Sequence, residues 1–173
     1  MTLSATAVAA TVAATHSSSG RALGPEPQWS VPVDDMTVPD RTRRLQVGSW
    51  WFLGGKDLQD RYITDLKRLD ADLKDAAASG HGGIDPARIR PVCADMGQIA
   101  RDAKRYFPAP DPGIQSFWRT FTTQLEKAGG HCRQSLDHGD TGLFHAYINE
   151  VTAAGQALTS VAKRVAEAAQ AAL

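Results

Sequence analysis

The chain has 173 residues, 42% of them hydrophobic, so it can form one domain with a core of ordinary size. Its 19 Lys and Arg balance 19 Asp and Glu, which gives a formal net charge of zero. Because nucleic acid binding needs a basic surface, we expect no nucleic acid partner.

Residues 1–20 differ in composition from the rest of the chain. Residues 1–19 contain no Asp, Glu, Lys or Arg and consist mostly of Ala, Thr, Val and Ser. They lack the basic start of a signal peptide, and their apolar part, residues 5–14, is too short to span a bilayer by itself. We interpret residues 1–20 as the remnant of an export signal or membrane anchor, with a disordered tail as the alternative. Export predicts an extracytoplasmic protein, anchored through its N-terminus or secreted; the alternative location is the cytoplasm.

Residues 21–40 have the composition of a linker. They contain Pro25, Pro27, Pro32 and Pro39, together with Gly and Ser. Proline fixes φ and removes a hydrogen-bond donor, so the backbone there should be extended and solvated. We therefore expect the folded domain to cover residues 41–173.

Basic and aromatic residues lie together at the start of this domain. The candidates for a contact surface are Arg41, Arg43, Arg44, Trp50, Trp51 and Phe52. One face of a helix cannot bury three consecutive aromatic side chains, so at least one should be exposed to a protein partner or a membrane surface. The alternative is that all three aromatics cover one end of the fold as an apolar plug. Three arginines on their own are more typical of a solvated flank.

After residue 55, apolar residues recur at alternating steps of three and four, which predicts four amphipathic helices. The first covers 56–78. Asp85-Pro86, a capping residue followed by a proline, predicts the start of the second helix. Pro91 leads us to expect regular helix only from Ile89 or Arg90. Asp111-Pro112 repeats the signal for the third, 112–136, and the fourth continues to the C-terminus.

Four such helices with short connections pack best as an antiparallel four-helix bundle with left-handed crossings of roughly 20°. No alternating pattern typical of strands competes with the helical period. The sequence therefore predicts an all-α fold, preceded by an extended N-terminal tail.

Cys93 and Cys132 fall on the apolar stripes of the second and third predicted helices. Such a pair predicts a disulfide in an exported protein and two buried thiols in a cytosolic one. Cys93 lies about 20 Å before the connection between the two helices and Cys132 about 30 Å after it. The bond therefore requires the third helix to begin some 10 Å beyond the end of the second, which the proline-rich connector allows. We predict that the two cysteines are bonded.

The polar residues form no recognisable catalytic or metal site. His131, His138 and His145 are spaced by seven, but Gly139-Asp140 predicts a turn that separates them. Four aspartates of the first helix are expected to face solvent beside Lys and Arg: Asp57, Asp60, Asp65 and Asp70. A nucleophile elbow and a P-loop are both absent from the sequence. We therefore expect no catalytic residue, metal or cofactor, and no enzyme.

Several short segments resemble a known group of proteins. They are Cys93-Ala94-Asp95-Met96, Pro110-Asp111-Pro112, Trp118, Cys132-Arg133 and Gly139-Asp140. From residue 50 to 173 the chain looks like the all-helical proteins that actinobacterial genomes encode, in which a membrane anchor or export signal precedes a bundle. The resemblance implies no particular activity.

Two functional hypotheses follow from the sequence. The first is a non-enzymatic extracytoplasmic bundle that acts through contacts with an unknown protein, or with a membrane surface. The alternative is a bundle that holds an apolar molecule or haem between its helices, with Met96 and either His131 or His145 as ligands.

Overall fold

The computed structural model describes residues 40–79 and 84–171. These residues form α1 (Asp40–Trp50), the π-helix η2 (Trp51–Gly55), α2 (Lys56–Ala78), α3 (Pro86–Arg105), α4 (Pro112–His138) and α5 (Thr141–Gln170). This part of the chain contains no strand, so the predicted all-α class is confirmed. The predicted export segment, and the predicted linker except for its last residue, lie outside the described residues.

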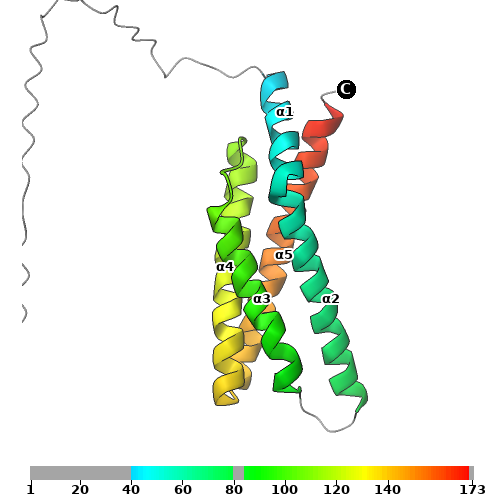
Figure 1. Cartoon of the computed structure of the whole chain (residues 1–173), viewed down its shortest axis with the longest axis vertical. Helices are drawn as coiled ribbons and strands as arrows, with labels where there is room; N and C mark the ends of the chain where they lie inside the picture. Colours follow the sequence, from blue (N-terminus) through cyan, green and yellow to red (C-terminus); the bar gives the residue numbers. More distant parts are fainter. Residues whose placement is uncertain (1–39, 80–83, 172–173) are drawn as a thin grey trace, which may run out of the picture. The chain divides into compact units, whose positions relative to one another are not determined.

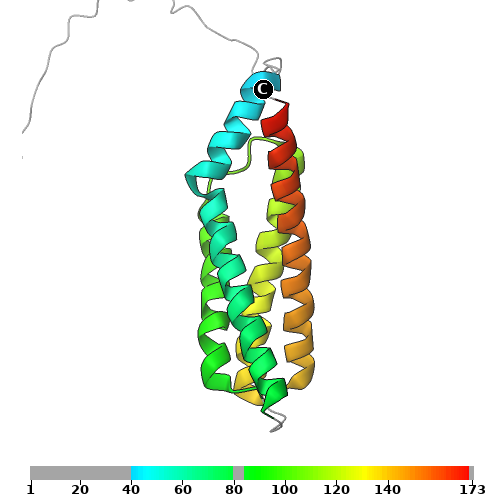
Figure 2. The same ribbon diagram turned by 90° about the vertical axis from the view of Figure 1, so that its right-hand side faces the viewer.

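The four long helices α2 to α5 alternate in direction and form an antiparallel bundle (Figures 1 and 2). α2 packs on α3, α3 on α4, and α4 on α5. α1 and η2 extend α2 at one end, and we call these three elements together the arm (Figure 1). There α1 packs on α5, and Val47 of α1, Ile114 of α4 and Arg164 of α5 line one cleft. The arm therefore continues the bundle past the end of α3.

α1 was not predicted from the sequence. Its inward residues, Val47 and Trp50, are buried, whereas Leu45 is exposed. Because large apolar residues lie on both faces, the helical period is hidden in the sequence. Gly54 and Gly55 belong to the π turn that joins α1 to α2. A Cβ atom on Gly54 would lie 2.7 Å from Cε2 of Tyr106, so glycine lets that ring pack against the turn.

α3 begins at Pro86, earlier than predicted, and Pro91 lies inside it. The Asp85 carboxylate caps the helix by accepting a hydrogen bond from the Ala87 amide (2.9 Å). An internal proline costs about 3 kcal/mol, but burying Ile89 and Val92 contributes about 1.5 to 3 kcal/mol each. Both side chains are at most 2% exposed, so their burial outweighs the lost hydrogen bond and the helix continues through the proline.

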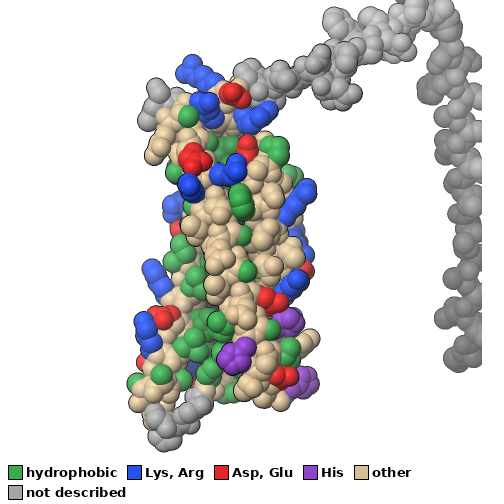
Figure 3. All heavy atoms as spheres, turned by 180° about the vertical axis from the view of Figure 1, so that it is seen from behind, with side chains coloured by type: hydrophobic (Ala, Val, Ile, Leu, Met, Phe, Trp, Pro, Cys, Tyr) green, Lys and Arg blue, Asp and Glu red, His purple; other side chains and the backbone are tan. Residues whose placement is uncertain are grey.

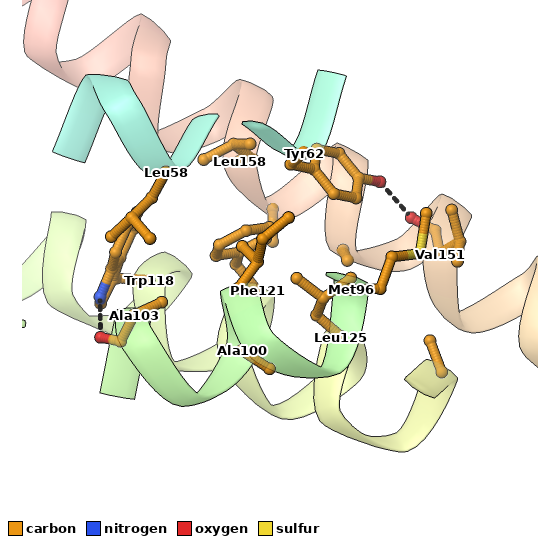
Figure 4. Packing of buried hydrophobic residues seen from close by; sticks show 14 of the residues in the cluster. Leu58, Tyr62, Met96, Ala100, Ala103, Trp118, Phe121, Leu125, Val151 and Leu158 are labelled. Carbon is orange, nitrogen blue, oxygen red and sulfur yellow. Dashed lines mark hydrogen bonds between the residues drawn. The ribbon is translucent and has the colours of Figure 1, made fainter. Parts of the chain in front are cut away.

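The core is centred on aromatic side chains from several helices (Figure 4). Phe121 is fully buried and contacts Tyr62 edge-on, with ring centroids 5.5 Å apart. The Tyr62 hydroxyl donates to the Val151 carbonyl (2.7 Å), and the Trp118 indole donates to the Ala103 carbonyl (3.1 Å). These hydrogen bonds satisfy the polar ends of buried aromatics and join α2 to α5 and α4 to α3.

α4 begins beyond the end of α3, and Figure 1 shows the connector rising between them. The offset brings the Cα atoms of Cys93 and Cys132 to 5.6 Å, and their sulfur atoms lie 1.96 Å apart, at disulfide distance. The overhang required by the sequence argument is therefore present. Both cysteines are fully buried.

Candidate contact surface at the aromatic corner

The bend between α1 and α2 lies beside the end of α3, and we call residues 50–55 together with Tyr106 and Phe107 the aromatic corner. Trp50 and Trp51 form its inner side and are only 6% and 7% exposed. The Trp50 ring packs edge-on against Trp118, with centroids 5.1 Å apart, and also contacts Tyr106. Both tryptophans are therefore core residues, as in the plug alternative. This corrects the predicted contact surface at these two positions, which follow Val47 on the inward side of the arm.

The outer side of the corner is apolar and solvent-exposed. The large apolar side chains that are exposed in the described part of the chain are Leu45 (60%), Phe52 (75%), Leu53 (80%) and Phe107 (76%). Three of the four belong to the aromatic corner. A single exposed apolar residue is ordinary, but adjacent ones often mark a binding site.

Two hydrogen bonds fix the backbone that carries these side chains. The Trp50 indole donates to the Phe107 carbonyl (2.7 Å), and the Tyr106 hydroxyl donates to the Trp50 carbonyl. Trp50, the last residue of α1, is thus tied to residues 106 and 107 by one hydrogen bond in each direction. Burial raises the pKa of the Tyr106 hydroxyl, which therefore stays protonated and keeps its donor role at neutral pH. Phe52, Leu53 and Phe107 are consequently displayed from a fixed frame.

The three arginines of the predicted surface do not face one direction. Arg41 is exposed on α1. Arg43 and Arg44 line the cleft near the end of α5, which also contains Asp111 and Glu167, and the Arg44 guanidinium donates to the Ala171 carbonyl. The six predicted residues therefore do not form one surface: Trp50 and Trp51 are buried, and Arg43 and Arg44 contact the bundle.

The residues considered for haem ligation lie apart. Met96 is fully buried, and its sulfur accepts a hydrogen bond from the Tyr147 hydroxyl (3.7 Å). His131 pairs through Nδ1 with Glu150 (2.9 Å) at the surface, and His145 is exposed. Histidines are visible on the surface near one end of the bundle in Figure 3. In the described ranges, no three His, Cys, Asp or Glu side chains are placed to hold a metal ion.

Asp65 was predicted to face solvent, but it is only 3% exposed. Arg68 donates to one of its carboxylate oxygens (3.3 Å), and the other oxygen is buried without a hydrogen-bond partner. Burial raises the pKa of Asp65 to about 6, and the nearby charge of Asp95 acts in the same direction. A signal was present in the sequence, because Leu58, Tyr62, Asp65 and Leu69 follow steps of four, three and four.

Comparisons of the chain with protein-family models, with curated proteins and with solved structures give no match. Nor does any described helix combine the length and the apolar character needed to cross a bilayer. The function therefore has to be inferred from the geometry of the chain itself.

Proposed function

We propose that this chain is a non-enzymatic, extracytoplasmic helical-bundle protein that acts through protein–protein contacts at the aromatic corner. The observation that carries the proposal is the exposure of Phe52, Leu53 and Phe107 on a backbone held by reciprocal hydrogen bonds. These three side chains point away from the core, which is filled by Trp50 and Trp51. Together they expose an apolar surface that a partner protein can bury.

The energetics favour binding at this place. Burying an exposed Phe or Leu side chain contributes about 1.5 to 3 kcal/mol, and aromatic residues dominate many interfaces. A fixed backbone also lowers the entropy that binding must overcome. The exposed side chains of the corner carry neither a nucleophile nor a carboxylate, so their chemistry suits recognition better than catalysis.

Two features support a location outside the cytoplasm. Cys93 and Cys132 lie at disulfide distance, and disulfides persist mainly in oxidising compartments. The uncharged composition of residues 1–19 is typical of an export or anchor segment.

Site-specific photo-crosslinking in the full chain tests the proposal. A photoreactive phenylalanine analogue at position 52 should be cross-linked to protein in the native host, whereas the same analogue at exposed Lys127 of α4 serves as the matched control. Adding Leu53→Ser and Phe107→Ser should abolish the adducts at position 52. Adducts to lipid alone, or the same protein adducts at both positions, would refute protein recognition at the corner.

A further inference from the structure

A pocket lies beside the aromatic corner, where the connector passes from the end of α3 to the start of α4. It has a volume of about 340 Å³. Its lining comes from both helices and from the connector: Ala103, Lys104, Tyr106, Pro108, Gln115, Trp118, Arg119, Thr122 and Thr123. Tyr106 is shared with the aromatic corner, and exposed Phe107 lies between two lining residues in the sequence. The apolar surface of the corner therefore adjoins the rim of this pocket.

The charged residues that line this pocket are both cations. Lys104 is paired with Glu126 (2.5 Å), and both side chains are about half exposed. Arg119 is exposed, and its guanidinium has no ion pair or hydrogen bond with any described residue. By contrast, the groove between α2 and α3 is lined by three carboxylates as well as two arginines: Asp60, Asp65, Asp95, Arg61 and Arg68. In the pocket, no described Asp or Glu is among the lining residues, so Arg119 lacks a counterion there.

The other polar groups of the pocket leave mainly donors open. The Gln115 side-chain oxygen accepts a hydrogen bond from the Ala109 amide (2.6 Å), so its NH₂ group is the end that remains available. The Trp118 indole and the Tyr106 hydroxyl already donate to backbone carbonyls. The Thr122 hydroxyl donates to a carbonyl of its own helix (2.9 Å). An occupant that supplies acceptor atoms and a negative charge would therefore satisfy the groups that the fold leaves open.

The open groups lie in one row on α4. Gln115, Arg119 and Thr123 are spaced by four residues, so their side chains follow one another along one face of the helix. The rings of Tyr106 and Trp118 also line the pocket and contact each other, with centroids 6.4 Å apart. An ion pair formed against aromatic rings is less screened by water than one on an open surface. A guanidinium in this setting suits a carboxylate, with which it can form two parallel hydrogen bonds.

From these features we propose that the protein bound at the aromatic corner inserts an Asp or Glu side chain into this pocket. Its carboxylate pairs with the Arg119 guanidinium and accepts a hydrogen bond from the Gln115 amide. Apolar residues of the same partner cover Phe52 and Phe107. The partner is therefore a protein whose contact surface combines apolar side chains with an acidic one. This inference rests on the proposed function and adds the chemistry of the partner.

The pocket would give the apolar contact its selectivity. Apolar side chains bind many apolar surfaces, whereas a charged pair fixes the orientation of a partner and repels wrong ones. A partner with a basic residue at this place would meet Arg119 and Lys104. A partner with an apolar residue there would cover Arg119 and leave its charge unpaired, which is unfavourable. Both would bind less tightly than an acidic partner.

Photo-crosslinking from position 52 in the full chain measures the contribution of Arg119 in the native host. Arg119→Glu should lower the yield of protein adducts by at least about tenfold, because it replaces an attraction with a repulsion. Arg119→Gln removes only the charge and should lower the yield by about threefold. Arg133→Glu is the matched control, since Arg133 is another exposed arginine of α4 and lies outside the pocket lining. It should keep the wild-type yield, and urea titrations should show that all three variants are folded.

A zero-length cross-link identifies the acidic side chain itself. Arg119→Lys places a primary amine in the pocket, and a water-soluble carbodiimide joins an amine to a carboxylate only where the two are in contact. Applied to the complex captured from position 52, the reagent should link position 119 to an Asp or Glu of the partner. Arg133→Lys, treated in the same way, should give no such link. Mass spectrometry of the digested complex locates the bond.

Two results would overturn the inference. One is a yield of adducts at position 52 that persists in Arg119→Glu or falls equally in Arg133→Glu. The other is a carbodiimide reaction that links no partner carboxylate to position 119. In either case, protein adducts at position 52 of the wild type would still support the proposed function, and only the acidic side chain would be excluded. If position 52 contacts no protein, both fail.

Discussion

The α3/α4 and α2/α5 contacts lie in the same bundle but are held in different ways. Between α3 and α4, the buried sulfur atoms of Cys93 and Cys132 lie 1.96 Å apart. One turn along, a Cβ atom on Gly129 would lie 3.0 Å from the Cα atom of Gly97, so the two backbones almost touch. The disulfide and the close approach of the two glycines therefore hold α3 and α4 together.

Between α2 and α5, the helices leave a groove, and the Tyr62 hydroxyl crosses it to the Val151 carbonyl. Next to this hydrogen bond, a Cβ atom on Gly155 would meet the Tyr62 oxygen at 3.0 Å. The same helix, α2, carries the buried carboxylate of Asp65. We therefore regard α3 and α4 as the fixed base of the protein, and we propose that the arm is the part that makes contacts.

Removing the disulfide should weaken the contact between α3 and α4 and have the largest effect on stability. Cys93 and Cys132 are 39 residues apart, and closing a loop of this length stabilises the fold by about 4 kcal/mol in the chain-entropy model. Cys93→Ala with Cys132→Ala should lower the unfolding free energy by that amount in a urea titration, and reduction of the wild type should give a similar loss. Two free thiols in the protein isolated from its native host, detected by mass, would contradict the bond.

The buried carboxylate of Asp65 in α2 should make the stability of the protein depend on pH. Its pKa, raised by burial to about 6, exceeds the value near 3.9 expected in the unfolded chain, so the folded state binds the proton more tightly. The contribution of Asp65 to stability is therefore greatest below pH 4 and falls by about 3 kcal/mol as the pH rises to 6 and above.

Asp65→Asn should remove this part of the pH profile. In denaturant titrations, the unfolding free energy of the variant should therefore increase relative to that of the wild type between pH 4 and 6. Asp70→Asn, whose side chain is exposed, is the matched control and should keep the wild-type profile. Parallel profiles for the wild type and Asp65→Asn would show that position 65 does not titrate in this range.

Two adjacent glycines of α4 test the close approach of the α3 and α4 backbones. Gly129→Ala should destabilise the protein by about 2 kcal/mol, because the new methyl group forces the α3 and α4 backbones apart. Gly130→Ala meets no atom within 4 Å and should stabilise it by about 0.5 to 1 kcal/mol through helix propensity. Thermal or urea unfolding measures both, and equal effects at the two positions would contradict the close approach.

Tyr62→Phe removes the hydrogen bond that crosses the groove between α2 and α5, and it should have the smallest destabilising effect of these substitutions. The Val151 carbonyl also lies within a regular helix, so the loss should be about 1 kcal/mol. The amides of α2 should exchange faster in this variant, while those of α3 keep their protection. An equal rise of exchange in both helices would show that the hydrogen bond supports the whole bundle.

The sequence predicted some of these features and missed others for identifiable reasons. The span of α2 was predicted with its observed bounds, because its charged residues mostly face outward and a glycine-rich segment follows it. The register of the two cysteines was accessible because helix rise converts residue numbers into distance. α1 was missed because its apolar residues lie on both faces, with Val47 and Trp50 buried and Leu45 exposed.

The candidate site was only partly predictable. Phe52 lies on the surface, but the burial of Trp50 and Trp51 depends on Trp118 and Tyr106, which come from distant parts of the chain. Phe107 and Leu53 could not be assigned to the surface, since the neighbours that bury or expose a connector residue are set by tertiary packing. Asp65 was placed in solvent by its residue type, although its spacing put it on the buried stripe.

Hydrogen exchange of the full chain tests the central claim most directly. Amides of α2 between residues 59 and 66 should exchange faster than those of α3 and α4 around Cys93 and Cys132. Uniform protection of all helices, or faster exchange in α3 and α4 than in α2, would contradict the division into a fixed base and a contact arm.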